Sequence, residues 1–298
     1  MICLTTHASS TRQALNAATD ALRAAGIEDP RLDAELLLAS ATGWDRARLV
    51  AATEVEVPSA AARLFGEMVR RRLRREPVAY IVGRRGFRRI ELAVDPRVLI
   101  PRPETELLVE LALELAPRRA LDVGTGSGAI ALAVADELPG CEVVAADTSP
   151  AALEVARANA ERLGLADRVS FHEGTLPPVD AGFDLVLANL PYVSEAEWPS
   201  LAPEVTEWEP REALLAGSDG LDAIRALLSD PPATACLALE VGARQANAVE
   251  DLMRNAGFVD TETRNDLSNV ERVVIGRPRS ADFVFSGAYG PKTTKSPR

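Results

Sequence analysis

Several residue types are scarce in this 298-residue chain, which holds three cysteines, two histidines and only 4% aromatic residues. The cysteines, Cys3, Cys141 and Cys236, are odd in number and far apart in the sequence. Such spacing is not typical of a disulfide framework or a zinc site, so no metal is expected. Because aromatic rings are few, alanine, leucine and valine must fill most of the hydrophobic core.

Long apolar runs and an excess of positive charge are missing as well. No segment reaches the roughly 18 apolar residues of a membrane span, and the N-terminus lacks the basic and then apolar stretch of a signal peptide. The cytoplasm is the predicted location, without a membrane partner. The net charge of −11 argues against a stable nucleic-acid partner, since phosphate binding requires clustered Lys and Arg.

Helical periodicity is the main pattern in the first quarter of the chain. Leu and Ala recur at helical spacing in residues 11–25 and 31–40, and Pro58 is placed to begin a longer helix. No strand pattern interrupts this part of the sequence. Residues 1–78 are therefore predicted to form a helical domain.

Beyond this domain the pattern changes to strands. Residues 80–83 and 87–94 predict a hairpin within a linker of residues 79–103. Helices and apolar strands then alternate over residues 104–278, which predicts a parallel, doubly wound α/β sheet with an antiparallel edge. Residues 279–298 show no periodicity and are predicted to be a disordered tail. The strands predicted for the sheet are 120–123, 142–146, 169–172, 183–188, 235–241, 259–264 and 272–276.

A glycine-rich loop follows the first predicted strand of the sheet. Residues 121–130 read Leu-Asp-Val-Gly-Thr-Gly-Ser-Gly-Ala-Ile. Glycine lets the backbone turn sharply and approach a ligand closely, and the helix that follows offers free N–H groups at its N-terminus. The pattern predicts a cofactor loop; a plain strand-to-helix turn is the alternative. The residues predicted to bind the cofactor are Asp122, Gly124, Thr125, Gly126, Ser127 and Gly128.

The identity of the cofactor is less sharply defined, because Gly124–Ala129 also fits the dinucleotide fingerprint. Two features favour S-adenosylmethionine. A third glycine follows at the next alternate position, and Asp122 near the end of the strand suits a cationic ligand better than a pyrophosphate. Asp147 closes the next strand and can accept hydrogen bonds from ribose hydroxyls, which suits either cofactor.

A second loop, Asn189-Leu190-Pro191-Tyr192, follows an apolar strand, at the sheet edge where α/β proteins bind ligands. The Asn189 side-chain oxygen and the Leu190 carbonyl can each accept an N–H bond from a planar NH2 group. Tyr192 can lie against the flat face of that group, and Pro191 stiffens the loop. Methyl transfer to such a nitrogen depends on orientation and electrostatics, so these four residues are predicted to be catalytic. An ordinary turn is the alternative.

Several segments resemble those of a known family. With the two loops, they indicate similarity to the HemK/PrmC-type protein-(glutamine-N5) methyltransferases, which modify peptide chain release factors, over roughly residues 10–278. The most specific segments are Glu-Pro-Val-Ala-Tyr-Ile-Val-Gly at 76–83 and Leu-Ile-Pro-Arg-Pro-Glu-Thr-Glu at 99–106, followed by 209–214, 217–221 and 269–272.

This resemblance implies a Rossmann-like, seven-stranded methyltransferase sheet with an N-terminal helical domain and a connecting β-hairpin. It implies S-adenosylmethionine as cofactor, and as substrate the glutamine in the Gly-Gly-Gln loop of class 1 release factors, with the chain acting as a monomer. By position, Asn189 to Tyr192 would hold the glutamine amide, with Asn189 also beside the cofactor. Asp147 would hold the cofactor and Thr175 would flank the adenine.

Two positions depart from the family pattern. Leu190 replaces the usual Pro, and residues 173–175 lack the usual Asp and aromatic residue. Asn-Leu-Pro-Tyr also occurs in ribosomal RNA adenine dimethyltransferases, but their extra helical domain follows the catalytic one, whereas here the helices come first. A nucleic-acid adenine-N6 methyltransferase is therefore the alternative. An NAD-dependent oxidoreductase is supported only by the glycine pattern and has no evident acid or base for hydride transfer. A non-catalytic binding module would leave Asn189–Tyr192 unexplained.

Two further features are given ordinary structural interpretations. The basic run at residues 70–75 is predicted to be a solvated helix face, with a docking patch for a release factor or RNA as the alternative. Glu240, at the end of a predicted strand, is expected to make only a structural hydrogen bond.

Overall fold

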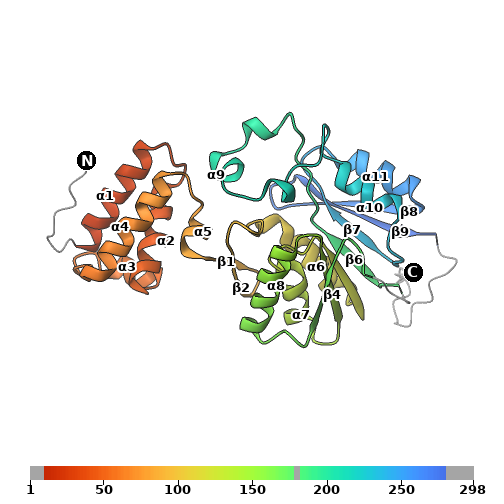
Figure 1. Ribbon diagram of the computed structural model, residues 1–298, viewed down its shortest axis with the longest axis horizontal. Coiled ribbons are helices and arrows are strands. Elements are labelled where there is room, and N and C mark those ends of the chain that lie inside the picture. Colours follow the sequence, from red (N-terminus) through yellow and green to blue (C-terminus); the bar gives the residue numbers. More distant parts are fainter. Residues whose placement is uncertain (1–9, 178–181, 280–298) are drawn as a thin grey trace, which may run out of the picture.

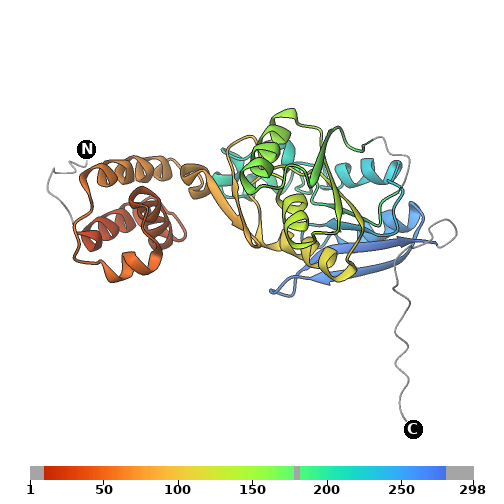
Figure 2. The same ribbon diagram turned by 90° about the horizontal axis from the view of Figure 1, so that it is seen from below.

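The computed structural model describes residues 10–177 and 182–279. Figures 1 and 2 show a helical N-terminal lobe (α1 to α4) and a larger sheet lobe (β3 to β9), joined by a short connection. The N-terminal lobe packs around a core that includes Leu15, Leu37 and Phe65. Its helices are α1 (Thr11–Ala24), α2 (Pro30–Thr42), α3 (Arg46–Ala51) and α4 (Ser59–Leu73).

The connection differs from the predicted one in its first element. The strand predicted at residues 80–83 is wrong, because this run lies in a short helix, α5 (Val78–Val82). The Tyr80 and Ile81 N–H groups both donate to the Pro77 carbonyl at 3.0 Å, and Gly83 ends the helix with φ +78°. A four-residue apolar run has no periodicity that separates a helix from a strand, so Pro77 and Gly83 decide the outcome.

The predicted hairpin does form, further along the chain. Strands β1 (Arg84–Phe87) and β2 (Ile90–Ala93) pair antiparallel. Asn159, fully buried on helix α8 (Pro150–Leu163), exchanges two hydrogen bonds with the Ala93 backbone and donates a third to the Ser127 carbonyl. One amide side chain thereby ties the hairpin to the glycine-rich loop.

The sheet has seven strands in the order β5-β4-β3-β6-β7-β9-β8, with β9 antiparallel to both β7 and β8. The predicted Rossmann-like sheet with an antiparallel edge is therefore confirmed. The strands are β3 (Arg119–Val123), β4 (Glu142–Asp147), β5 (Val169–Glu173), β6 (Leu185–Ala188), β7 (Leu237–Glu240), β8 (Phe258–Asn265) and β9 (Glu271–Pro278).

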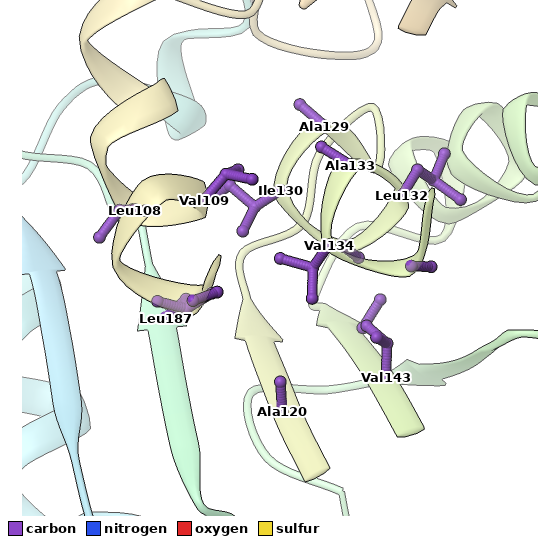
Figure 3. Packing of buried hydrophobic residues seen from close by; sticks show 14 of the residues in the cluster. Leu108, Val109, Ala120, Ala129, Ile130, Leu132, Ala133, Val134, Val143 and Leu187 are labelled. Atoms are coloured by element: carbon purple, nitrogen blue, oxygen red, sulfur yellow. The ribbon is translucent and has the colours of Figure 1, made fainter. Parts of the chain in front are cut away.

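Apolar side chains alternate between the two faces of the sheet. Helices α6 (Glu106–Leu115) and α7 (Ala129–Glu137) pack on one face, where Leu108, Ile130 and Leu187 share a core (Figure 3). Helices α10 (Asp222–Ser229) and α11 (Ala246–Asn255) cover the other face, where Ile224 and Val249 pack on Val186. Because every central strand is buried on both faces, its apolar run is continuous, as in other parallel sheets.

Residues 198–213 form a segment that the periodicity did not predict as helical. It contains two 3-10 turns, η2 (Trp198–Ser200) and η3 (Arg211–Ala213), and the one-turn helix α9 (Pro203–Thr206). Glu209 accepts from the Ile100 N–H at 3.1 Å and pairs with Arg102 at 2.5 Å. The segment is thereby fixed to the 99–106 run that precedes α6.

The basic run at the end of α4 is partly exposed to solvent and partly buried in ion pairs. Arg72 is 7% exposed and pairs at 2.7 Å with both Asp33 on α2 and Glu204 on α9, and Arg75 also pairs with Glu204. Arg74 is exposed. The solvated-face interpretation is therefore wrong for the buried part of the run, which joins the N-terminal lobe to the sheet lobe.

Other expectations are only partly covered by the structure. The predicted tail, residues 279–298, lies beyond the described residues except for position 279, and Cys3 also falls outside them. Cys141 and Cys236 are buried and free. Within residues 10–177 and 182–279, no helix is both long and apolar enough to cross a membrane.

Candidate active site

The two predicted loops meet at the point where the strand order of the sheet reverses. Strands β3 and β6 are parallel neighbours, with Val123 opposite Ala188, and each loop leaves the carboxyl end of its strand. A Cβ placed on Gly124 would lie 3.2 Å from Leu190 Cδ2. This reversal is where open α/β sheets bind ligands, and the two loops are in contact there.

The glycine-rich loop has the backbone that its sequence predicts. Gly124, Gly126 and Gly128 have φ values of +75°, +56° and +85°, a region that other residues seldom adopt. The N–H groups of Gly124 and Thr125 donate to the Ala146 carbonyl at 2.9 and 3.0 Å. The loop is therefore held against β4 and leads into the N-terminus of α7.

Asp122 lies under this loop and is almost completely buried, with 1% of its surface exposed. Its Oδ2 accepts from the Thr125 hydroxyl at 2.6 Å and from the Ala131 N–H at 3.1 Å. Its Oδ1 has no hydrogen-bond partner among the described residues. Burial raises the pKa of Asp122 to about 7, because a low-dielectric site disfavours the charged carboxylate.

Asp147 ends β4 beside the glycine-rich loop. Its Oδ2 accepts from the Gly126 N–H at 2.8 Å, and its Oδ1 accepts from the Ser149 N–H at 2.9 Å. The Asp147 carbonyl accepts from the Gly174 N–H at 2.9 Å, next to Thr175, which is exposed. The structure thus brings Asp147 and the loop together, with Thr175 at their outer edge.

The Asn189–Tyr192 loop is half-buried and is held by residues distant in sequence. Asn189 Nδ2 donates to the Thr105 hydroxyl at 3.0 Å. Tyr192 donates to Glu240 Oε1 at 3.4 Å, and its carbonyl accepts from Gln245 Nε2 at 2.9 Å. Burial also raises the pKa of the Tyr192 hydroxyl, which therefore stays a donor at neutral pH.

Glu240 stands directly beside this loop. In the register of β6 and β7, Ala188 lies opposite Leu239, so Asn189 and Glu240 follow on neighbouring strands. Glu240 is 1% exposed, and burial raises its pKa from an ordinary value of 4.5 to about 7. Its Oε2 has no hydrogen-bond partner in the described part of the chain.

Sequence reasoning did not assign a role at the site to Thr105, Gly220, Glu240 or Gln245. Thr105 and Gly220 were visible only as parts of segments that resemble the family. A Cβ on Gly220 would come within 2.2 Å of the Tyr192 carbonyl oxygen, so only glycine fits there. Because no pattern in the sequence reports such cross-fold contacts, only the structure identifies them.

Both the N-terminal lobe and the sheet lobe are similar to known proteins. Residues 13–83 match the PrmC N-terminal domain and residues 120–208 match a methyltransferase domain. A release factor glutamine methyltransferase of Geobacter sulfurreducens is 43% identical over 85% of this chain and 91% of its own length. The Xylella fastidiosa protein of the same name is 44% identical over 86% and 97%. The chain belongs to the release factor glutamine methyltransferase family.

The fold of this family member is also found in solved structures. The catalytic domain of hMettl16, in complex with a MAT2A 3′UTR hairpin, aligns with a TM-score of 0.52 over 63% of this chain and 75% of its own, at 14% identity. That likeness shows the methyltransferase fold alone. The chain is a methyltransferase, and the predicted enzyme class is confirmed by the family.

A small pocket adjoins the site of this methyltransferase. It has a volume of about 190 Å³, and Tyr192 forms part of its wall. Its lining residues are Tyr192, Val193, Glu197, Ser200, Leu201, Gly242, Ala243, Gln245 and Arg272. Within the described residues, no group of three or more His, Cys, Asp or Glu side chains is arranged to hold a metal ion.

Proposed function

We propose that this chain transfers a methyl group from S-adenosylmethionine to the side-chain amide nitrogen (N5) of the glutamine in the Gly-Gly-Gln loop of class 1 release factors. The observation that carries the proposal is the contact between the two loops, with Leu190 Cδ2 at 3.2 Å from a Cβ position on Gly124. A cofactor at the glycine-rich loop then lies next to an amide held by Asn189.

The residues at the glycine-rich loop suit this cofactor. The buried Asp122 carboxylate, with Oδ1 unpartnered among the described residues, favours a ligand that carries positive charge and N–H donors. Asp147 keeps lone pairs on both oxygens that can accept from ribose hydroxyls, and the exposed Thr175 near it would flank the adenine. Among the predicted cofactor residues, Gly126 and Ser127 would contact the cofactor through the turn of the glycine-rich loop. Asn189 would contact it from the second loop.

The chemistry required of the second loop is orientation. When bound, the cofactor supplies an electrophilic methyl group on a sulfonium. Asn189 Oδ1 and the Leu190 carbonyl accept the two N–H bonds of the substrate amide, which aims the nitrogen and stabilises positive charge that grows on it. Tyr192 packs against the amide plane and Pro191 limits the motion of the loop. The methyl group would leave the sulfur as a neutral thioether when the N–C bond forms, and the nitrogen would then give up one proton to water, which leaves a neutral N-methyl amide.

The remaining predictions complete the proposal. We propose that residues 1–78 recognise the release factor, that residues 79–103 link them to a catalytic domain of residues 104–278, and that the chain acts as a monomer in the cytoplasm. A nucleic-acid adenine-N6 methyltransferase is the second candidate, because Leu190 gives the Asn-Leu-Pro-Tyr form of the loop. Incubation of the chain with cofactor and either release factor or ribosomal RNA, followed by mass spectrometry, separates the two. Methylation of RNA alone would contradict the release-factor assignment.

Asn189→Ala tests the role of the loop. Loss of one of two acceptors should lower kcat on a release factor by about 100-fold or more, because the amide is no longer aimed at the methyl group. The Kd for S-adenosylmethionine, measured by calorimetry, should change by less than about fivefold, since Asp122 and Asp147 remain. Unchanged turnover would refute a catalytic role for Asn189.

A further inference from the structure

The orientation of the Asn189 side chain decides whether it can serve as an acceptor. The oxygen and nitrogen of an amide are nearly the same size, so a 180° flip of the group costs little in packing. In the flipped orientation the NH2 group would face the substrate NH2, and two donors would meet. The site therefore requires a device that keeps Nδ2 away from the substrate and Oδ1 toward it.

Thr105 occupies the position where such a device would act. Its hydroxyl accepts from Asn189 Nδ2 at 3.0 Å, and the residue is 4% exposed. Thr105 ends the 3-10 turn that precedes α6, and α6 packs against both β6 and β7. A hydroxyl has one hydrogen, so the direction in which it donates determines whether its oxygen is left to accept from Asn189.

Glu240 stands next to the same hydroxyl. Its carboxylate interacts with the Thr105 and Tyr192 side chains, and Tyr192 donates to its Oε1 at 3.4 Å. An ionised carboxylate is only an acceptor. It therefore attracts the hydrogen of Thr105, which leaves the Thr105 oxygen to accept from Nδ2 of Asn189 and leaves Oδ1 for the substrate.

We propose that Glu240 and Thr105 are positioning residues that fix the direction of the Asn189 amide, so that Oδ1 faces the substrate nitrogen. The inference rests on the proposed function of Asn189. It assigns a task to a buried carboxylate whose Oε2 has no partner in the described part of the chain. A buried acid with one oxygen unpartnered destabilises a fold when ionised, so its presence beside the Asn189–Tyr192 loop requires a reason other than stability.

The charges around Glu240 are mixed. Arg272 on β9 favours the ionised carboxylate, whereas Glu104 before α6 disfavours it. The Tyr192 hydroxyl donates to the carboxylate at 3.4 Å, and the Thr105 side chain is near enough to interact with it. The arrangement keeps Glu240 close to the balance between its two protonation states, and only the ionised state gives Thr105 a partner that cannot donate.

Two pairs of variants test whether Glu240 and Thr105 position Asn189. Thr105→Val and Glu240→Met remove the hydroxyl or the carboxylate at similar volume, and each should lower kcat on a release factor by about 10- to 100-fold. Thr105→Ser keeps the hydroxyl and should stay within about fivefold of the wild type. Glu240→Gln is neutral and can itself donate to Thr105, so it should lower kcat as protonation of Glu240 does. The KM for release factor and the Kd for cofactor should change by less than about threefold, because Asn189 aims the amide rather than supplies most of its binding energy.

Non-additivity gives the sharper criterion. The Thr105→Val/Glu240→Met double variant should be no slower than the slower single variant, since both act through one side chain. In an Asn189→Ala background, neither substitution should lower kcat further. Effects that multiply, or that persist without Asn189, would overturn the positioning role.

Matched controls separate positioning from folding. Glu137→Gln changes a carboxylate that is 2% exposed but lies at the far end of α7, paired with Arg88. Thr234→Val removes a buried hydroxyl near the opposite end of β7. Both should leave kcat unchanged. Equal kcat for Thr105→Val and wild type would overturn the inference alone, whereas a wild-type chain inactive on release factors would overturn the proposed function as well.

Discussion

Leu190 is the residue in the Asn189–Tyr192 loop that departs from the family pattern, and the structure indicates what its side chain does. Its Cδ2 atom lies against the glycine-rich loop, 3.2 Å from a Cβ position on Gly124. The side chain also packs on the core between the sheet and helices α10 and α11. The proposed chemistry uses only the Leu190 carbonyl, which any residue supplies. The side chain therefore acts in packing between the loops, not in recognition of the amide.

Leu190→Pro should consequently be well tolerated. The variant keeps the carbonyl and restores the residue that is usual in the family, so kcat on a release factor should stay within about threefold of the wild type. The measurement is steady-state methyl transfer, with the melting temperature recorded beside it. A fall of more than tenfold with an unchanged melting temperature would show that the Leu190 side chain itself contributes to catalysis.

For single residues, the sequence predicted the two loops but not the residues that hold them in place. Asn189 and Gly124–Gly128 were predicted as site residues because each motif is contiguous and follows an apolar strand. Thr105 and Asn189 are 84 residues apart in the chain, and the choice of a hydrogen-bond partner across that distance depends on how the strands are ordered. Glu240 has no sequence signal beyond its place at a strand end, so its role beside Asn189 required the register of β6 and β7.

At the scale of elements, the contact between α4 and α9 is the clearest case of a structural feature that charge patterning misrepresents. A run of arginines is typical of a solvated face. Here Arg72 turns inward to two carboxylates, Asp33 and Glu204. Charges removed from water are stable only when paired, so α4 and α9 depend on each other.

Arg72→Ala should therefore lower the free energy of unfolding by about 3 kcal/mol, since it leaves the largely buried Asp33 without its arginine and Glu204 with Arg75 alone. Arg74→Ala, on the same helix end but exposed, should change it by less than about 0.5 kcal/mol. Urea unfolding of the two variants and the wild type provides the comparison. Similar effects of the two substitutions would mean that the Arg72 ion pairs contribute little.

Element boundaries show a second limit of sequence reasoning. Every strand of the sheet was predicted close to its observed place. In β4 and β6 the signal is a run of four buried apolar residues, which is hard to mistake when helices flank it. Helix α5 was mistaken for a strand, and α9 was missed, because each is about one turn long. Proline, glycine and tertiary contacts decide the conformation of such short elements.

At the scale of the whole molecule, two buried carboxyl groups link stability to pH. Burial raises the pKa values of Asp122 and Glu240 to about 7 in the folded chain. Between their ordinary values and about 7, the folded state holds protons that the unfolded state has released, so stability falls as the pH rises through this range. The lowered pKa of Glu137 acts in the opposite sense, but only at more acidic pH.

The free energy of unfolding of the cofactor-free chain should accordingly fall from pH 5.5 to pH 8, by about 2 kcal/mol for each of the two acids. Glu240→Gln cannot ionise, so it should remove about half of the fall and be more stable than the wild type at pH 8. Denaturant titrations at both pH values test this. An identical slope in wild type and variant would show that Glu240 ionises equally in the folded and unfolded states.

The same titration should have the opposite effect on activity. If ionised Glu240 fixes the direction of the Asn189 amide, kcat at saturating cofactor should rise as the pH rises through about 7, while the stability of the fold declines. In Glu240→Gln this part of the kcat profile should be flat, although Asp122 still titrates. A molecule selected for stability alone would carry an apolar residue at position 240. The buried acid is therefore explained by the reaction, and a wild-type kcat without this pH dependence would remove that explanation.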